Sequence, residues 1–331
     1  MRLKAGLHAR RGGRATHAAL FYTGEREYLD GVSGFLAPAI ESGAPVVIAA
    51  PKLGLERLRD GLNGASKRVE LLDMAELGVN PARIIPAIGE VVDAHPDELV
   101  YFVGELDWSA REQEEIAEAA YHEALINRAF RGKRVEILCP YDLNASGAEI
   151  VAEAERTHPL LCHRHGRSAS AAYAHRALPT HCEAPLHAPP REARSLRFEL
   201  DDLIRVRTLV SEEAARAGLP LGQCGDVVLA VDELATNSIR HGGGSGTICV
   251  WRSDGRVTCE VSDAGRIQDP LVGRVRPQPG ARAGRGLWIV NQLCDLVQIR
   301  SGPRGTTVRI HARRTESRGR ASRTPNGQSP R

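Results

Sequence analysis

Hydrophobic runs alternate with amphipathic stretches through the first half of this 331-residue chain. The apolar runs are short and bounded by polar or glycine-rich segments, as is typical of buried strands; they cover residues 18–22, 45–50, 69–72, 99–103 and 135–139. The stretches between them have helical periodicity, over residues 25–41, 53–62, 81–94, 110–130 and 145–154. Because strands and helices alternate, we expect an α/β domain whose parallel sheet is covered by helices on both faces.

Ligands of such domains bind at the carboxyl ends of the parallel strands. Together with His17, which lies at the start of the first strand, this rule selects as candidate ligand contacts Tyr22, Glu105, Trp108, Cys139 and Tyr141. The loop after the first strand, residues 23–26, has neither the GxxxxGK(S/T) nor the GxGxxG pattern. The first domain is therefore not expected to bind a phosphate by that route.

In the second half, the most informative segment is a predicted helix that ends at three glycines, residues 242–244. Glu233, Asn237 and His241 recur every four residues and share one face of this helix. A carboxylate and a carboxamide one turn apart suit Mg²⁺, which prefers oxygen ligands, and the carboxylate can also act as a general base. The alternative is an amphipathic surface helix with a glycine C-cap. An apolar stripe on another face consists of Leu229, Ala230, Leu234, Ala235 and Ile239.

Three further motifs follow within about 75 residues. Asp263 and Gly265 come directly after an alternating strand, where a carboxylate can accept a hydrogen bond from an exocyclic amine. Gly284 and Gly286 form a turn that opens an apolar helix at Leu287, and free N–H groups at a helix start favour an anion such as phosphate. A closing strand begins with the hydroxyl-bearing pair Thr306 and Thr307.

With these motifs in this order, residues 195–312 resemble the GHKL ATP-binding domain shared by gyrase, histidine kinases and anti-sigma-factor serine kinases. The sequence around Glu233 and Asn237, from Asp232 to Gly242, is most similar to that of the anti-sigma regulatory serine kinases. The resemblance implies an α/β sandwich of the Bergerat type that binds ATP and Mg²⁺. The family's second glycine in the Asp-x-Gly-x-Gly motif is Ile267 here, which puts the local turn geometry in question.

The resemblance also implies a role for each matching residue. Glu233 would polarise the attacking group as the catalytic residue, and Asn237 would hold Mg²⁺. Asp263 would accept a hydrogen bond from the adenine amine, and the turn at Gly284 and Gly286 would contact the phosphates. The remaining expected nucleotide contacts are Gly265, Leu287, Thr306 and Thr307.

Residues 266–283, between the two glycine motifs, are rich in proline, glycine and arginine. Arginine forks suit phosphate oxygens, and a mobile loop can close over a bound nucleotide. We therefore favour a lid over an ordinary solvated loop. Its arginines are Arg266, Arg274, Arg276 and Arg282, with Arg285 just beyond.

The first half also resembles a family, the MEDS sensory domain of methanogen and methylotroph regulators. The matching stretches within residues 17–160 are 17–22, 73–81, 122–127, 139–142 and 157–159. The resemblance implies a RecA-like sheet that has lost its nucleotide loop and senses small molecules such as hydrocarbon derivatives. The pair His122 and Glu123 is also compatible with the phosphoacceptor box of histidine kinases, although the surrounding apolar residues favour a histidine packed in the domain's own helix.

Composition sets the remaining limits. Residues 1–16 carry five basic and no acidic residues, and residues 311–331 carry six and one, so both ends are expected to be disordered tails (residues 1–16 and 313–331). The body between them, with 33 basic and 40 acidic residues, has a net charge of −7, which argues against nucleic-acid binding. The apolar runs are too short to span a membrane. Seven cysteines without a CxxC pair indicate reduced thiols and a cytoplasmic protein.

Residues 161–194 are expected to form a linker rich in histidine, proline and alanine. Its histidines and cysteines match no zinc spacing, so a metal site there remains an open alternative.

The leading functional hypothesis is an ATP-dependent serine/threonine protein kinase of the anti-sigma regulatory type, controlled by the first domain as a sensor. Its partners would be an anti-sigma-factor antagonist, a sigma factor and a small-molecule ligand of the first domain, and a homodimer stays open. The alternatives are a non-catalytic switch, in which the nucleotide only sets the affinity for a partner, and a histidine autokinase.

Overall fold

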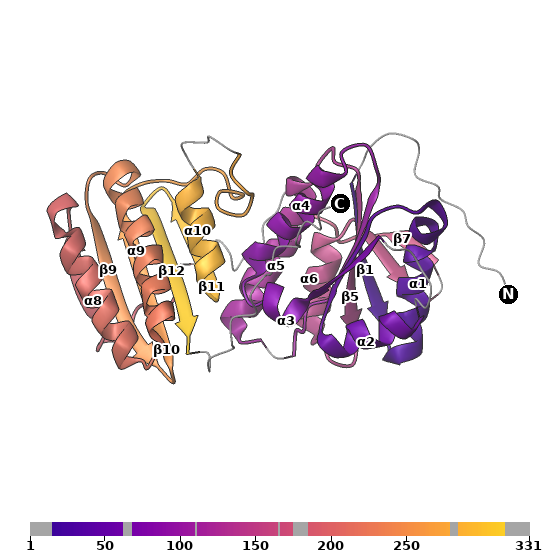
Figure 1. Cartoon of the computed structure of the whole chain (residues 1–331), viewed down its shortest axis with the longest axis horizontal. Helices are drawn as coiled ribbons and strands as arrows, with labels where there is room; N and C mark the ends of the chain where they lie inside the picture. The colour runs from indigo at the N-terminus through magenta and orange to yellow at the C-terminus, as the bar shows by residue number, and fades with distance from the viewer. Residues whose placement is uncertain are drawn as a thin grey trace, which may run out of the picture.

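The computed structural model describes residues 15–61, 68–109, 111–164, 166–174, 185–278 and 284–314, which form two α/β lobes side by side (Figure 1). The first lobe contains a seven-stranded sheet in the order β3-β2-β4-β5-β1-β6-β7. The strands from β3 to β6 run parallel, and β7 is antiparallel to β6. The strands are β1 (Thr16–Tyr22), β2 (Val46–Ala50), β3 (Val69–Asp73), β4 (Val100–Gly104), β5 (Val135–Asp142), β6 (Leu160–His163) and β7 (Gly166–Ala169).

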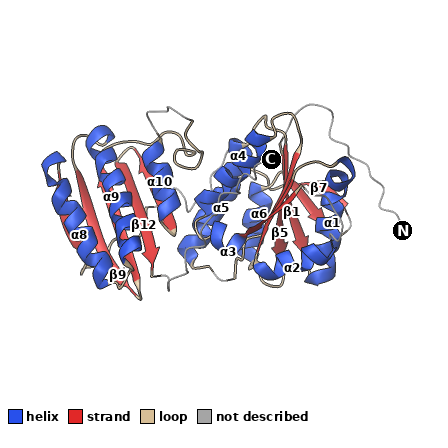
Figure 2. Ribbon diagram, in the orientation of Figure 1, coloured by secondary structure: helices blue, strands red, loops and turns tan. Residues whose placement is uncertain are grey.

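Helices cover both faces of this sheet (Figure 2). One face packs against α1 and α2, through residues such as Val32 and Leu58, and the other against α4, α5 and α6, through residues such as Ile88 and Ile126. The predicted α/β fold of this half is confirmed. Its helices are α1 (Gly24–Ser42), α2 (Lys52–Gly61), α3 (Met74–Leu77), the 3₁₀ turn η1 (Pro81–Arg83), α4 (Ile84–Ala94), α5 (Gln113–Ala129) and α6 (Ala148–Thr157).

The predicted linker, residues 161–194, begins inside the first sheet. β6 pairs in parallel with β1, and β7 folds back on β6. Residues 160–169 therefore extend the first domain at one edge of its sheet. Residues 175–184 of the linker, most of residues 1–16 and residues 315–331 lie outside the described residues, so the predicted tails are not addressed by the structure.

The second lobe pairs a five-stranded antiparallel sheet, in the order β11-β12-β10-β9-β8, with three helices on one of its faces (Figure 1). Val206, Val227 and Val290 from the three helices pack against Val250 and Ile310 of the sheet. This is the predicted α/β sandwich. Its elements are β8 (Arg194–Phe198), η2 (Leu200–Asp202), α8 (Leu203–Arg216), α9 (Leu221–His241), β9 (Gly246–Ser253), β10 (Arg256–Asp263), α10 (Arg285–Leu293), β11 (Leu296–Gly302) and β12 (Gly305–Arg313).

The apolar stripe predicted for α9 is correct except at one position. Leu229 is 45% exposed, whereas Val227 and Val231 are buried against the sheet. The buried positions of α9 recur at intervals of three and four residues through Val227, Ala230, Val231 and Leu234, which is the spacing of one helix face. Leu229 falls between them and faces solvent.

The two lobes contact each other mainly through α5, which lies between the first sheet and the second sheet (Figure 1). Acidic residues of α5 and its N-cap meet arginines from the face of the second sheet opposite its helices, with Glu112 pairing with Arg256 and Arg313. η1 adds a second contact, in which the Asn80 and Arg83 side chains donate hydrogen bonds to backbone carbonyls at the end of α10. No helix among the described residues is both long and apolar enough to cross a membrane.

Candidate functional site

A cavity of about 350 Å³ lies between α9, the end of β10, the start of α10 and β12 in the second lobe. This volume is within the range of small-molecule sites in proteins. Leu234, Val261 and Val308 contribute apolar walls. Most of the nucleotide contacts expected from the sequence also line it, namely Asn237, Asp263, Gly265, Gly284, Gly286, Leu287 and Thr306.

Asp263 is held in position at the end of β10 by neighbouring donors. The Ser238 hydroxyl donates a hydrogen bond to Oδ2 at 2.6 Å, and the Gly265 amide donates one to Oδ1 at 2.7 Å. The Thr306 hydroxyl donates to the Gly265 carbonyl at 2.9 Å, so β12 also supports this turn. The carboxylate is therefore an oriented acceptor at one end of the cavity, and a ligand with an amino group would complement it.

Glu233 and Asn237 lie where α9 meets the start of α10; Asn237 lines the cavity, whereas Glu233 is not among its lining residues. A Cβ atom on Gly286 would come within 2.7 Å of Glu233 Oε2 and 3.1 Å of Asn237 Nδ2, so a larger residue there would push the tip of the Glu233 side chain aside. Gly284, with φ of 84°, occupies the N-cap position of α10, and no side chain caps the helix there. The amide groups of the first turn are consequently available to an anion.

This arrangement fits Mg²⁺ together with a phosphate group. One carboxylate and one carboxamide oxygen, side by side on α9, leave most coordination positions for water and phosphate oxygens, as Mg²⁺ requires. The start of α10 faces the same place and favours negative charge.

Thr307 and Ile267 differ from their expected settings. Thr307 points to the face of β12 opposite Thr306 and does not line the cavity described above. Its hydroxyl lies 3.0 Å from that of Ser262 on β10. Ile267 lines the cavity at the position of the family's second glycine. Its φ is not positive, and its amide donates a hydrogen bond to the Ser301 hydroxyl at 2.8 Å, so an L-residue fits this turn without backbone strain.

The candidate ligand contacts of the first domain do not form one pocket. Tyr22 and Glu105 lie on the face covered by α1, where the hydroxyls of Tyr22 and Tyr28 donate to the Glu105 carboxylate at 3.0 and 2.8 Å. Burial of this group raises the pKa of Glu105. Trp108 lies on the opposite face and stacks on Tyr141, with ring centroids 5.6 Å apart.

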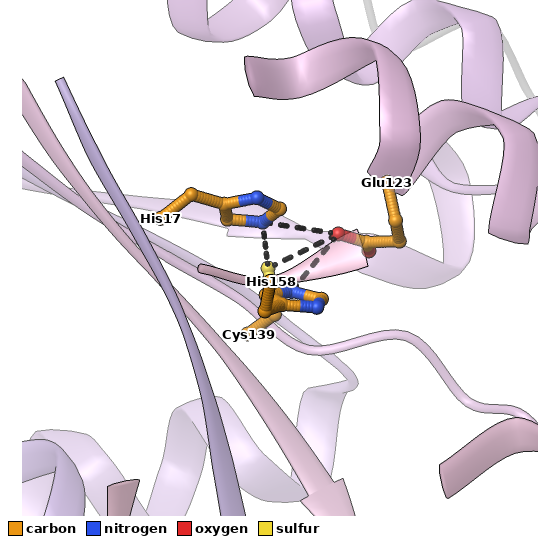
Figure 3. Close-up of side chains that lie close together, drawn as sticks. All are labelled: His17, Glu123, Cys139 and His158. Carbon is orange, nitrogen blue, oxygen red and sulfur yellow. Dashed lines mark hydrogen bonds and ion pairs between the residues drawn. The ribbon is translucent and has the colours of Figure 1, made fainter. Parts of the chain in front are cut away.

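His17 and Cys139 belong to a separate, deeply buried cluster on that opposite face (Figure 3). They contact Glu123 of α5 and His158, the residue that follows α6. The neighbouring His122 is 1% exposed, and burial lowers its pKa to about 3. A histidine buried in this way is not accessible to a phosphate donor, which disfavours the histidine autokinase hypothesis.

Two protein families match the chain in separate regions. Residues 16–159 match the MEDS family, described as the methanogen/methylotroph, DcmR sensory domain, and residues 196–312 match the histidine kinase-like ATPase domain. The chain joins a MEDS domain to a histidine kinase-like ATPase domain. A sensor domain fused to such an ATPase domain indicates an ATP-binding regulatory protein.

Other comparisons add little. No curated protein matches the chain. A crystal structure of RsbU and RsbW domains from Mycobacterium tuberculosis is 22% identical over 36% of this chain and 32% of its own, with a TM-score of 0.27. The chain thus spans about a third of the length of that protein, and a TM-score this low supports no inference.

The loop that leads from the ATPase cavity toward α10 is attached to the MEDS domain. Arg274 is 2% exposed, forms an ion pair with Glu118 of α5 at 3.0 Å, and lies 4.9 Å above the centre of the Tyr121 ring. Arg276 pairs with Glu90 at 2.6 Å. We expected the arginines of this predicted lid to suit phosphate oxygens, but Arg274 and Arg276 instead pair with acidic groups of the MEDS domain. Of the other loop arginines, Arg266 lines the cavity and Arg282 lies outside the described residues.

Two residues of these contacts, His158 and Glu118, are not indicated by any pattern in the sequence. His158 is part of a stretch that resembles the MEDS family, but nothing in its spacing connects it with His17 or Cys139. Glu118 lies in a helix with many other glutamates, and its partner Arg274 follows 156 positions later. Such contacts become visible only once the domains are packed together.

Proposed function

We propose that this protein is an ATP-dependent serine/threonine kinase of the anti-sigma regulatory type, whose ATPase domain is controlled by its MEDS domain. The observation that carries the proposal is the close approach of Glu233 and Asn237 to Gly286 at the start of α10, beside a cavity that ends at Asp263. The site thus offers a carboxylate, a metal-binding amide and an anion-binding helix start in one place.

The geometry supports a specific division of roles. Asp263 accepts a hydrogen bond from the adenine amine, and the amides at the start of α10 bind the phosphates. Mg²⁺, held by Asn237 and phosphate oxygens, would neutralise negative charge on the phosphates.

Glu233 acts on the incoming hydroxyl. A serine hydroxyl of a partner protein attacks the γ-phosphorus, the bond from the γ-phosphorus to the bridging oxygen breaks, and ADP leaves. Glu233 accepts the proton of that hydroxyl. The partner of the proposed type is a small anti-sigma-factor antagonist, and a sigma factor would bind in the alternative state.

The contact between Arg274 and Glu118 supports control by the MEDS domain. Residues 266–269 and Val272 line the ATPase cavity, and Arg274 fastens the same loop to α5. A ligand of the MEDS domain whose affinity differs between two positions of α5 would shift α5 toward one of them. The loop and the shape of the cavity would then change together with α5.

The test is phosphotransfer from γ-labelled ATP to antagonist proteins recovered with the full-length protein by affinity purification. We expect label on serine or threonine, stable to acid, with the intact protein. Thr307→Ala, which lies outside the cavity, should transfer label normally, whereas Glu233→Gln should bind ATP but transfer little. A protein that binds ATP and changes its affinity for the partner without transferring label would instead be a nucleotide-dependent binding switch.

A further inference from the structure

Four side chains with metal-binding atoms converge in the core of the MEDS domain (Figure 3). His17 comes from β1, Cys139 from β5, Glu123 from α5, and His158 from the position after α6. One nitrogen, oxygen or sulfur atom from each lies within 4.8 Å of all the others. Every one of these residues is 4% exposed or less.

Four of the six distances between these atoms are close to those between the ligands of a tetrahedral metal ion, and the other two are at most 4.8 Å. Glu123 Oε2 lies 3.2 Å from His17 Nε2, 3.4 Å from His158 Nε2 and 3.5 Å from Cys139 Sγ. His17 Nε2 lies 3.3 Å from Cys139 Sγ. Bonds of about 2.0–2.3 Å to a tetrahedral ion place neighbouring ligand atoms about 3.3–3.8 Å apart. These side chains therefore need little movement to surround one ion.

The hydrogen bonding of His158 prepares its other nitrogen for a metal. Its Nδ1 lies 2.8 Å from the carbonyl oxygen of Ala154, and since a carbonyl only accepts, Nδ1 carries the hydrogen. Its Nε2 lies 3.4 Å from Glu123 Oε2, and this buried atom makes no hydrogen bond among the described residues. Metal-binding histidines commonly use this arrangement, in which a backbone carbonyl fixes the tautomer.

The charge of the cluster also calls for a cation. The ion-pair partners of Glu123 among the described residues are His17 and His158, and no lysine or arginine there pairs with it. A buried carboxylate without a permanent cation is unfavourable. A divalent ion with one carboxylate and one thiolate would be electrically neutral.

We propose that His17, Glu123, Cys139 and His158 bind one Zn²⁺ ion in a closed tetrahedral site. Two imidazole nitrogens and a thiolate favour Zn²⁺ over Mg²⁺ or Ca²⁺, which prefer oxygen ligands. Four protein ligands leave no open position, so the ion is structural and joins β1, β5, the interior of α5 and the end of α6. On binding, Cys139 loses its thiol proton to solvent and forms the metal–sulfur bond.

The experiment measures metal directly in the full-length protein, so it does not depend on the proposed kinase activity. Protein purified without chelators is analysed for metal content, stripped with a chelator, and refilled with Co²⁺ as a spectroscopic substitute for Zn²⁺. We expect about one Zn²⁺ per chain, and with Co²⁺ a thiolate-to-metal charge-transfer band in the near ultraviolet.

Three variants assign the site. Cys139→Ser should abolish the thiolate band and lower the metal content. Cys162→Ser removes a buried cysteine of the same domain that contacts Arg167 rather than the cluster, and should keep both. Cys182→Ser, in the linker outside the described residues, should also keep both.

The opposite results would overturn the proposal. Loss of the band in Cys182→Ser with its retention in Cys139→Ser would move the metal to the linker. A wild-type protein that holds no zinc and gives no thiolate band with Co²⁺ would make the cluster a plain hydrogen-bond network. If Cys139→Ser does not fold, the melting temperature of the wild-type protein tests the proposal instead. Removing a structural ion must lower this temperature, and adding the ion back must restore it.

Discussion

Replacing Glu118 by glutamine should release the loop of the ATPase domain from the MEDS domain. Glu118 is 1% exposed and receives hydrogen bonds from Arg274 at 3.0 Å and from Arg300 at 2.9 Å. Glutamine keeps the size of the side chain but removes its charge, and Arg274, only 2% exposed, would be left as a buried cation. Breaking a buried ion pair in this way costs about 3–5 kcal/mol.

The loop can avoid this cost by moving into solvent, so the penalty should appear as easier local opening. At about 1.4 kcal/mol for each factor of ten, the population of the open loop should rise by two to three and a half orders of magnitude, roughly 10²- to 4 × 10³-fold. The amides of Val272 and Arg274 donate hydrogen bonds to Asp269 and Leu271 within the loop, so they report on this opening. Hydrogen exchange followed by mass spectrometry should show them exchanging faster by about that factor.

Glu114→Gln is the matched control on the same helix. Glu114 is 32% exposed and lies 3.8 Å from Arg309, so this pair is worth about 0–1 kcal/mol and its loss should change loop exchange less than about fivefold. ATP affinity, measured by calorimetry, should fall in the Glu118 variant because residues 266–269 line the cavity. Equal exchange rates in wild type and Glu118→Gln, with both proteins folded by circular dichroism, would refute the coupling.

Four other changes test the remaining assignments. Asp263→Asn should weaken ATP binding about tenfold or more by calorimetry, because the adenine amine would meet a donor; unchanged affinity would contradict the adenine role. Glu233→Ala should still bind ATP but lower the rate of phosphotransfer by roughly 10². Asn237→Ala should lower both ATP binding and phosphotransfer, as filter-binding and label-transfer assays would show. Burial, helped by nearby arginines, lowers the pKa of His311 to about 3. The folded state therefore prefers the neutral ring. The free energy of unfolding, measured by urea titration, should be about 2 kcal/mol lower at pH 5 than above pH 6.5, and His311→Gln should remove this loss.

The elements of the MEDS domain were predictable because its central strands are buried on both faces. A strand such as β2 is wholly apolar, so its position is visible without any knowledge of its neighbours. β7 was not predicted, since all four of its residues are exposed and it carries no apolar pattern. It forms only because β6 provides an edge on which it can pair.

The ATPase cavity was largely predictable for a different reason. Its residues lie at element ends, where motifs with unusual glycines are visible in the sequence, and the antiparallel pairing of Asp263 with Thr306 brings two of them together. Alternation then separates Thr306 from Thr307, since successive residues of a strand face opposite sides. Thr306 therefore lines the cavity and Thr307 does not, and the contact of both threonines with the nucleotide stays a prediction.

The contact between the domains could not be predicted from one sequence. The glutamates of α5 have the appearance of a solvated helix face, and the partners of Glu118, namely Arg274 and Arg300, come from the loop and β11. A charged helix pairs with whichever surface folds against it, and residue spacing along the chain contains no information about that surface. The same limit applies to His158, which meets His17 only after the sheet has formed.

These two unpredicted features lie on one rigid element. Glu123 faces the buried cluster of the MEDS domain, and Glu118, five positions earlier on α5, holds Arg274 of the ATPase loop. At 1.5 Å per residue the two are about 7.5 Å apart along the helix axis. Because a helix moves as a unit over such a length, a change at Glu123 that shifts α5 must also shift Glu118. Under the proposed control by the MEDS domain, such a shift would break the buried ion pair with Arg274 and release the loop that lines the nucleotide cavity.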